Sequence, residues 1–161
     1  MWMPIHDPGE AFFRSPAGAV PVGTEITLRI ETPRTFEVRD AFLRVRYDAE
    51  KSMCRLPMRR VPPRDSGYDA FEGRLAAAEA GLVFYCFSLC RAGGLPYFYG
   101  KMEPDPEHPD VTGGIYNTED APLWQITLWR PQETPRWFGE GVTYGIFPDR
   151  FARSASWPAD R

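Results

Sequence analysis

The residues of this chain best suited to metal or redox chemistry are Cys54, Cys86, Cys90, His6 and His108. Cys86 and Cys90 lie four residues apart in an apolar run that predicts a strand, which would separate their Cα atoms by about 13 Å. A disulfide requires Cα atoms within about 7 Å, so this pair cannot close. The two histidines are remote from the thiols in sequence, and no zinc-binding spacing results. We expect buried, reduced thiols, no metal and no cofactor.

Charge and composition limit the partners that the chain can have. Its 161 residues include 19 Lys and Arg against 22 Asp and Glu, so the basic excess of a general nucleic-acid binder is missing. No stretch approaches the roughly 20 apolar residues of a membrane helix, and the start has no apolar signal-peptide core. We therefore expect a cytoplasmic protein with no nucleic-acid or membrane partner. Aromatic residues reach 14%, and their placement becomes the main question about function.

Alternation of apolar and polar residues with a period of two predicts an all-β protein. In residues 25–31 the side chains of Ile26, Leu28 and Ile30 share one face, and two other segments alternate in the same way, 41–47 and 124–129. Residues 82–90 are apolar on both faces, which is typical of a central strand. Weaker strand candidates are 12–15, 53–61, 70–75 and 97–99. Turns rich in Pro and Gly separate these runs, so we expect an immunoglobulin-like antiparallel β-sandwich.

The sequence changes in character after Trp129. Two prolines in residues 130–136 disfavour both helix and sheet, and a new apolar strand is predicted at 142–147. We therefore predict a sandwich over residues 1–130, a linker over 131–141, and the beginning of a further unit over 142–161.

The C-terminal segment resembles a known enzyme family. Pro135 and Trp137 are followed by Tyr144-Gly-Ile-Phe-Pro-Asp-Arg-Phe151. This pattern resembles the opening of the catalytic (β/α)8 barrel in glycoside hydrolase family 13, the α-amylase family, in its neopullulanase, cyclomaltodextrinase and maltogenic amylase branch. Upstream, His6-Asp-Pro8, Phe13-Arg-Ser-Pro16 and Tyr97-Phe-Tyr-Gly100 resemble the N-terminal β-sandwich of these enzymes, which is catalogued as carbohydrate-binding module family 34.

The resemblance implies a role in carbohydrate metabolism. Such relatives hydrolyse α-1,4 and sometimes α-1,6 glucosidic bonds with retention, using a nucleophilic carboxylate and a proton donor on later barrel strands. A whole barrel takes about 250 residues, so this chain would hold only its first strand, no catalytic residue and no activity of its own. Asp149 and Arg150 would then brace the turn after that strand. Some relatives bind calcium just beyond this motif, but Arg153 and Ser154 stand in that place here, and we predict no metal.

The resemblance also makes an α-glucan or malto-oligosaccharide the expected ligand of the sandwich. A sugar ring binds through its C–H face to a flat aromatic surface beside a few hydrogen-bonding groups. The candidate carbohydrate-binding residues are Trp129, Tyr97, Tyr99 and Trp137. Trp129 is the strongest because it shares a strand face with polar residues, whereas Tyr97 and Tyr99 could instead plug the sandwich or an interface. Trp137 is expected to pack between sandwich and barrel.

Three functions stay open at this point. The chain could be the N-terminal part of an α-glucan hydrolase that positions or restricts its substrate. It could be a stand-alone carbohydrate-binding module. It could also be a structural or dimerising domain, because the resemblance implies a homodimer contact through the sandwich, and aromatic residues are enriched at such interfaces.

Overall fold

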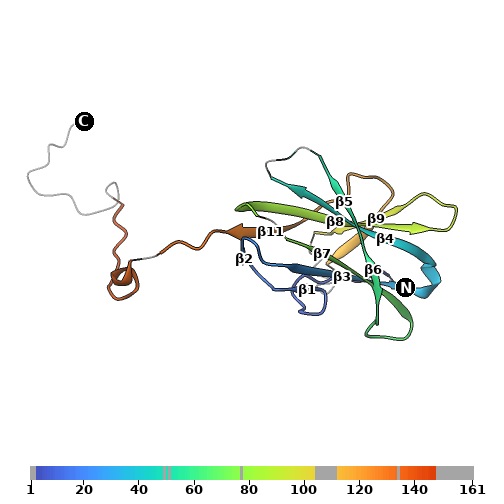
Figure 1. Cartoon of the computed structure of the whole chain (residues 1–161), viewed down its shortest axis with the longest axis horizontal. Coiled ribbons are helices and arrows are strands. Elements are labelled where there is room, and N and C mark those ends of the chain that lie inside the picture. The colour runs from blue at the N-terminus through green and yellow to red at the C-terminus, as the bar shows by residue number, and fades with distance from the viewer. Residues whose placement is uncertain are drawn as a thin grey trace, which may run out of the picture. The chain divides into compact units, whose positions relative to one another are not determined.

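The structure is a computed structural model that describes residues 3–48, 50, 52–76, 78–103, 112–133 and 135–147. The chain divides into two compact units, Met1–Pro131 and Gln132–Arg161. All the strands that the described residues form lie in the first unit, where two sheets face each other as a sandwich (Figure 1). Within the same described ranges, no helix is long and apolar enough to cross a membrane. The all-β prediction is confirmed.

The smaller sheet is antiparallel and has the strand order β1-β3-β7-β6. These strands are β1 (Arg14–Ser15), β3 (Ile26–Pro33), β7 (Tyr68–Leu75) and β6 (Arg59–Val61). Alternation along β3 turns Ile26, Leu28 and Ile30 inward, where none of them is exposed. On β7 the inward residues Phe71 and Leu75 pair with Ile30 and Ile26.

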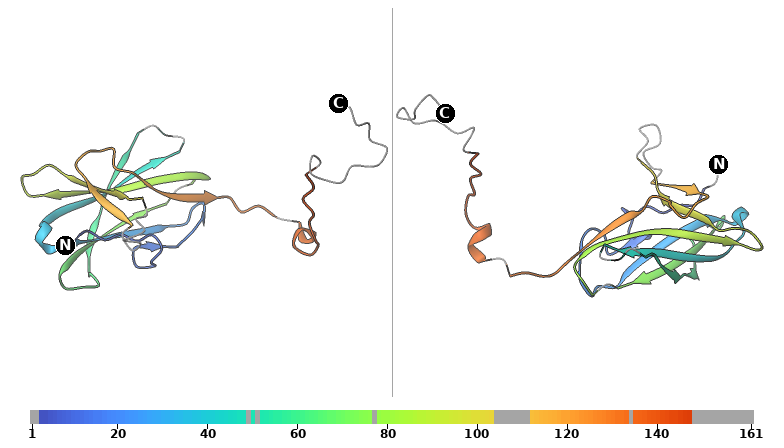
Figure 2. Two further views of the ribbon diagram at one scale, coloured as in Figure 1. Left: turned by 180° about the vertical axis from the view of Figure 1, so that it is seen from behind. Right: turned by 90° about the horizontal axis from the view of Figure 1, so that it is seen from above.

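The larger sheet is built around β8 (Gly81–Arg91), the longest strand of the described residues. One edge of β8 pairs with β4 (Val38–Tyr47), which continues to β5 (Cys54–Pro57). The other edge is divided, since β11 (Trp124–Trp129) pairs with residues 81–85 and β9 (Tyr97–Lys101) pairs with residues 87–89. Beyond these, β10 (Gly113–Tyr116) extends β9, and β2 (Val20–Pro21) runs parallel to β11. Figure 2 shows β4 and β8 side by side along the length of the sandwich.

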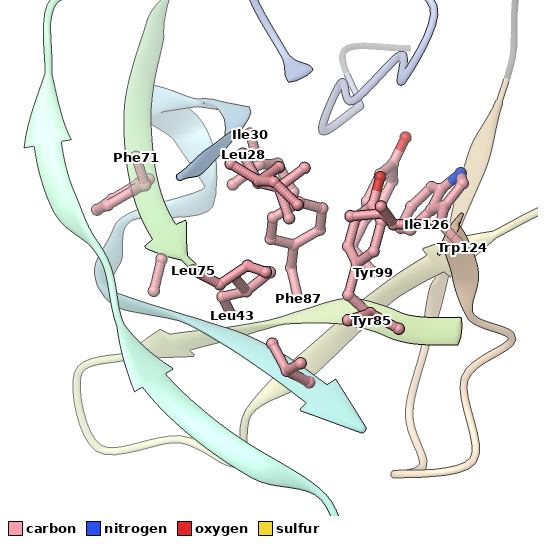
Figure 3. Close-up of a cluster of buried hydrophobic side chains, with 14 of the residues drawn as sticks. Leu28, Ile30, Leu43, Phe71, Leu75, Tyr85, Phe87, Tyr99, Trp124 and Ile126 are labelled. Atoms are coloured by element: carbon pink, nitrogen blue, oxygen red, sulfur yellow. The ribbon is translucent and has the colours of Figure 1, made fainter. Parts of the chain in front are cut away.

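The core fills the space between the two sheets. Figure 3 shows Leu28 and Ile30 of the smaller sheet facing Leu43 and Phe87 of the larger one. At one side of this cluster Trp124 stacks on Tyr85, with ring centroids 5.6 Å apart. The aromatic excess seen in the composition is therefore partly explained by ring packing in the core, which buries large apolar areas.

The second unit is described only in part. It contains a single 3-10 turn, η2 (Arg136–Gly139), in its described residues. The strand expected at 142–147 pairs with no other described segment, so it forms no ladder there. A strand is stabilised through neighbours on its edges, and no described strand flanks this one. Pro148 to Phe151, which complete the sequence motif, lie outside the described residues.

Candidate functional site

Trp129 ends β11 on the outer face of the larger sheet. Its side chain is 43% exposed, and Gln125 and Thr127 on the same face are exposed too. The carbonyl of Trp129 accepts a hydrogen bond of 2.9 Å from the N–H of Val22, and Trp129 lies in register with Pro21 of β2. These contacts hold the end of the strand, so the indole is presented from a fixed backbone.

Tyr97 and Tyr99 of β9 point the other way, toward the inside of the sandwich. Tyr99 pairs with Phe87 and is only 2% exposed, with its ring centroid 5.8 Å from that of Trp124. Burial raises the pKa of its hydroxyl. A Cβ on Gly113 would lie 2.7 Å from the Tyr99 ring, so the ring packs directly on that glycine. Tyr99 therefore has no face free for a sugar, whereas Tyr97 is half-buried and borders solvent.

Tyr97 lies in a cleft at the end of β8 where β8 turns into β9. Two adjoining hollows of about 420 and 310 Å³ share Tyr97 and Arg91. The residues that give this Tyr97 cleft its chemistry are Tyr97, Arg91, Glu37, Asn117, Thr35 and Phe36. The cleft thus combines a phenol and a phenyl ring with a guanidinium, a carboxylate, an amide and a hydroxyl.

The polar groups of the Tyr97 cleft are only loosely engaged with one another. Nη1 of Arg91 donates a 3.3 Å hydrogen bond to the Tyr97 hydroxyl, and the guanidinium carbon lies 5.9 Å from the ring centroid. Nη2 of Arg91 is 3.9 Å from the Glu37 carboxylate, and the two side chains are 40% and 79% exposed. An ion pair of this length and exposure contributes little to stability, so both groups stay available to a ligand.

Backbone irregularities coincide with this cleft. Glu37 follows the 3-10 turn η1 (Arg34–Phe36) and has φ 50° and ψ 41°; it is the one non-glycine residue with positive φ among those described. This conformation costs a residue with a side chain about 1 kcal/mol. The register of β4 against β8 shifts immediately afterwards, between Val38 and Asp40. Such bulges re-aim side chains at the rims of sheets.

The structure does not bring the predicted aromatic residues together. Leu128, next to Trp129, pairs with Gly81, whereas Tyr97 pairs with Leu89 at the other end of β8. Eight residues of strand separate these two pairs, which corresponds to about 26 Å. Figure 1 shows the turn between β8 and β9 at the end of the sandwich opposite the point where β11 leaves it. Trp129 and the Tyr97 cleft are therefore two separate surfaces.

Trp137 lies in the second unit, at the start of η2, and is 70% exposed. Its ring contacts Phe138 edge to face at 6.0 Å. Five more large hydrophobic side chains among the described residues of this unit are at least 59% exposed: Phe138, Val142, Tyr144, Ile146 and Phe147. Trp137 is thus an exposed side chain of the second unit, and its expected packing between sandwich and barrel stays a prediction.

The outer face of the larger sheet carries a set of arginines stacked on aromatic rings. Arg55 lies 3.5 Å from the centroid of Phe42, and Arg46 lies 4.8 Å from that of Phe84. Neither guanidinium forms an ion pair with another described residue. Nη2 of Arg55 donates a 3.5 Å hydrogen bond to Sγ of Cys90. Cation–π contacts of this kind hold a guanidinium against the face of a ring.

His6 is fully buried, and both of its ring nitrogens form hydrogen bonds inside the sandwich. Because a carbonyl can only accept, Nδ1 donates to the carbonyl of Arg29 at 2.6 Å, and Nε2 accepts from the Tyr85 hydroxyl at 2.9 Å. Burial lowers the pKa of the imidazole from 6.5 to about 4, although the bond to the Arg29 carbonyl acts in the opposite direction. A neutral His6 therefore ties the N-terminal segment to the centre of the sandwich.

Glu72 is a buried carboxylate on the outer side of the smaller sheet. Its oxygens lie 2.5 Å from Arg59, 2.7 Å from Arg29 and 3.0 Å from Arg74. Burial alone would raise the pKa of this carboxyl, but hydrogen bonds from Arg59, Arg29 and Arg74 outweigh it and lower the pKa to about 2. A carboxylate held ionised in this way cannot serve as a proton donor near neutral pH.

The cysteines are less uniformly buried than expected. Cys86 is buried, Cys90 is half-buried and Cys54 is exposed, and all three are free thiols. Burial raises the pKa of the Cys86 thiol to about 11. Cys54 is exposed because β5 lies at the outer edge of its sheet. In the described part of the chain, no group of three His, Cys, Asp or Glu side chains could hold a metal ion.

Several residues of the Tyr97 cleft were missed by sequence reasoning. Arg91, Glu37 and Asn117 are far apart in the chain and belong to no motif. They meet only because β4 and β9 pair with opposite edges of β8. The sequence offers one signal, the turn Gly93-Gly-Leu-Pro96 beside Tyr97, which marks a hairpin loop but not what lies against it.

Comparison with known proteins identifies distant relatives. No family model matches the sequence. The amylopullulanase of Thermoanaerobacter thermohydrosulfuricus is 30% identical over 150 residues, covering 91% of this chain and 10% of that protein. The amylopullulanase of Thermoanaerobacterium saccharolyticum is 31% identical over 150 residues, with 91% and 11% covered. The chain thus spans about a tenth of the length of these curated relatives.

A solved structure shares the fold. A cyclomaltodextrinase superposes with a TM-score of 0.58 and 17% sequence identity, over 88% of this chain and 22% of that one. At this identity the likeness concerns the fold alone. The sequence likeness to the amylopullulanases shows that the chain is distantly related to a region of those proteins.

Proposed function

We propose that this chain is an α-glucan-associated module of an α-amylase-family glycoside hydrolase that acts on α-1,4, and in part α-1,6, glucosidic bonds. The observation that carries the proposal is the 30–31% identity to amylopullulanases along 91% of the chain. By their names, these relatives act on α-linked glucans. The assignment to the neopullulanase, cyclomaltodextrinase and maltogenic amylase branch, and to the cytoplasm, belongs to the same proposal.

The module's part in this function is to bind sugar and not to cleave it. Retaining glycosidases need two carboxyl groups about 5–5.5 Å apart, one ionised and one able to donate a proton. The buried carboxylates of the sandwich are unsuited to this, because Glu72 is held by three arginines and Glu31 accepts hydrogen bonds from Arg64. Trp129 and the Tyr97 cleft instead offer aromatic rings beside hydrogen-bonding groups, as sugar binding requires.

The second unit fits the lead-in and first strand of a catalytic barrel. Its sequence motif supports this, as do the exposed side chains of Trp137, Tyr144, Ile146 and Phe147. Apolar residues exposed at this density usually mark a surface that another element covers. In the proposed full enzyme, the remaining strands of the barrel would provide that cover.

The direct test is a binding measurement on the whole chain. We expect maltoheptaose to bind with a Kd of about 1 mM or tighter by calorimetry, which corresponds to about −4 kcal/mol. Cellohexaose, whose glucose units are joined by β-1,4 bonds, serves as the matched control and should not bind. Absence of heat with both sugars, confirmed by unchanged tryptophan fluorescence, would refute an α-glucan-binding role.

A second candidate function is homodimerisation through the sandwich. The observation that favours it is the outer face of the larger sheet, where Trp129 is exposed and arginines stack on Phe42 and Phe84. Arginine and aromatic residues are enriched at protein interfaces. Light scattering that gives twice the chain mass, and a monomer for Trp129→Ala, would support this function over sugar binding at the same face.

A further inference from the structure

We infer that the Tyr97 cleft is the site where this chain binds an α-glucan. One or two glucose units would lie between Tyr97, Arg91, Glu37 and Asn117. This inference rests on the proposed function and adds the location and chemistry of the binding site. It also departs from the sequence analysis, which favoured Trp129. The outer-face surface around Trp129 is the competing location.

The first support is shape. The two hollows of about 420 and 310 Å³ fall within the range of small-molecule sites, about 300–1,000 Å³. The half-buried rings of Tyr97 and Phe36, together with Ile115, give the cleft its apolar lining. Trp129, by contrast, stands on a sheet face and lines neither of these two hollows. A sugar in the cleft would bury more of its surface than one lying on that face.

The second support is the set of polar groups. Each hydroxyl of a glucose ring can donate and accept, so a good site offers both roles. In the cleft Arg91 donates, Glu37 accepts, and Asn117 does both. The loose contact of 3.9 Å between Arg91 and Glu37 contrasts with the 2.5 Å pair of Arg59 and Glu72 on the smaller sheet. Arg91 and Glu37 can therefore give up their weak contact with each other and form hydrogen bonds to the hydroxyl groups of a sugar.

The third support is the charge of the site. The charged residues that line the cleft are one arginine and one glutamate, so they offset each other. Neither an anionic nor a cationic ligand is favoured by such a pair. A neutral molecule rich in hydroxyl groups matches it, because charged donors and acceptors form the stronger hydrogen bonds to uncharged partners.

The fourth support is the backbone of Glu37. A residue with a side chain in the left-handed region persists only where its surroundings fix it, and such residues cluster at binding sites. The register shift between Val38 and Asp40 immediately follows. Glu37 lines the cleft together with the turn that leads to Tyr97.

The test compares variants at the two surfaces. In the full chain, Tyr97→Ala should weaken maltotriose binding about tenfold through the lost ring contact. Glu37→Gln and Asn117→Ala, both at exposed positions that leave the core intact, should each weaken it about three- to tenfold. Thr118→Ala, an exposed neighbour that does not line the cleft, is the matched control and should bind as the parent does. Loss of binding in Trp129→Ala, with parental binding in Tyr97→Ala, would overturn the inference.

A site-resolved measurement completes the test. Maltotriose added to the isotope-labelled chain should shift the amide resonances of residues 35–37, 91–97 and 115–117. Shifts confined to residues 125–129, with parental binding by the Glu37 and Asn117 variants, would overturn the inference and leave the proposed function standing. If the parent chain binds no α-glucan at all, the proposed function falls and the inference falls with it.

Discussion

Acid should destabilise this protein in a pH range set by one buried histidine. His6 is fully buried and its pKa is about 4 in the folded chain, compared with 6.5 when unfolded. The unfolded state therefore binds one more proton between these values, and the stability present above pH 6.5 is lost as the pH falls toward 4. A difference of about 2.5 pKa units corresponds to about 3 kcal/mol of unfolding free energy. The steepest loss is about 1.4 kcal/mol per pH unit.

Urea unfolding of the full chain at several pH values between 7.5 and 4.5 measures this loss. The comparison variant is His6→Asn, whose amide can still donate to the Arg29 carbonyl but does not titrate. We expect it to be less stable at pH 7.5, since it leaves space among Phe13, Phe87 and Trp124. Between pH 6.5 and 4, its unfolding free energy should fall less steeply with decreasing pH than that of the parent, because one fewer proton is taken up on unfolding.

Parallel pH profiles for the parent and His6→Asn would refute this reasoning. A second measurement does not depend on how stable the variant is. In an NMR titration of the parent, the His6 ring resonances should keep their neutral positions down to about pH 5, since the folded pKa lies below that. A midpoint near 6.5 for this ring would show that it is not shielded from water as the structure has it.

Two further predictions concern packing and charge. Glu72→Gln should lower the unfolding free energy by about 3 kcal/mol. Because the pKa of Glu72 is lowered on folding, its carboxylate stabilises the folded state above pH 4.5 and loses this effect as the pH falls to 2, so the variant should lose less stability over that range. Acid titration by circular dichroism measures this, and an unchanged acid transition would contradict it. Gly113→Ala should cost about 1–3 kcal/mol, since its Cβ would lie 2.7 Å from the Tyr99 ring. Gly114→Ala, whose nearest neighbour is the flexible Met102 sulfur at 3.3 Å, should cost less in the same thermal unfolding assay, and the reverse order would contradict the packing described.

Alternation made much of the sandwich predictable from sequence. The inward faces of β3 and β11 follow directly from their patterns, and the two-sided apolar run of β8 correctly indicated a strand paired on both edges. Two strands were missed. β2 has only two residues and β10 begins with two glycines, so neither has an alternating pattern of its own. Each is defined only by its pairing with β11 or β9.

The candidate site was predictable only in part. The exposure of Trp129 follows from alternation within one strand. The difference in burial between Tyr97 and Tyr99 does not follow from alternation, because both side chains are on the same face of β9. Tyr99 pairs with Phe87 in the core, whereas Tyr97 pairs with Leu89 closer to the end of β8. The meeting of Glu37 with Arg91 depends on the register of β4 against β8, which joins residues more than fifty positions apart. A period-two pattern carries no information about such a register.

The divided edge of β8 has a consequence for how the sandwich opens. Residues 81–85 are held by β11 and residues 87–89 by β9, so the sheet forks on either side of Cys86. Separation of β9 from β8 would break the hydrogen bonds between these two strands and leave those between β11 and β8 intact. β4 pairs with both halves of β8 along its other edge. Segments that recognise ligands are commonly those that open most cheaply. Because Tyr99 of β9 packs against Trp124, opening without loss of the ring cluster is limited to the Tyr97 end of β9.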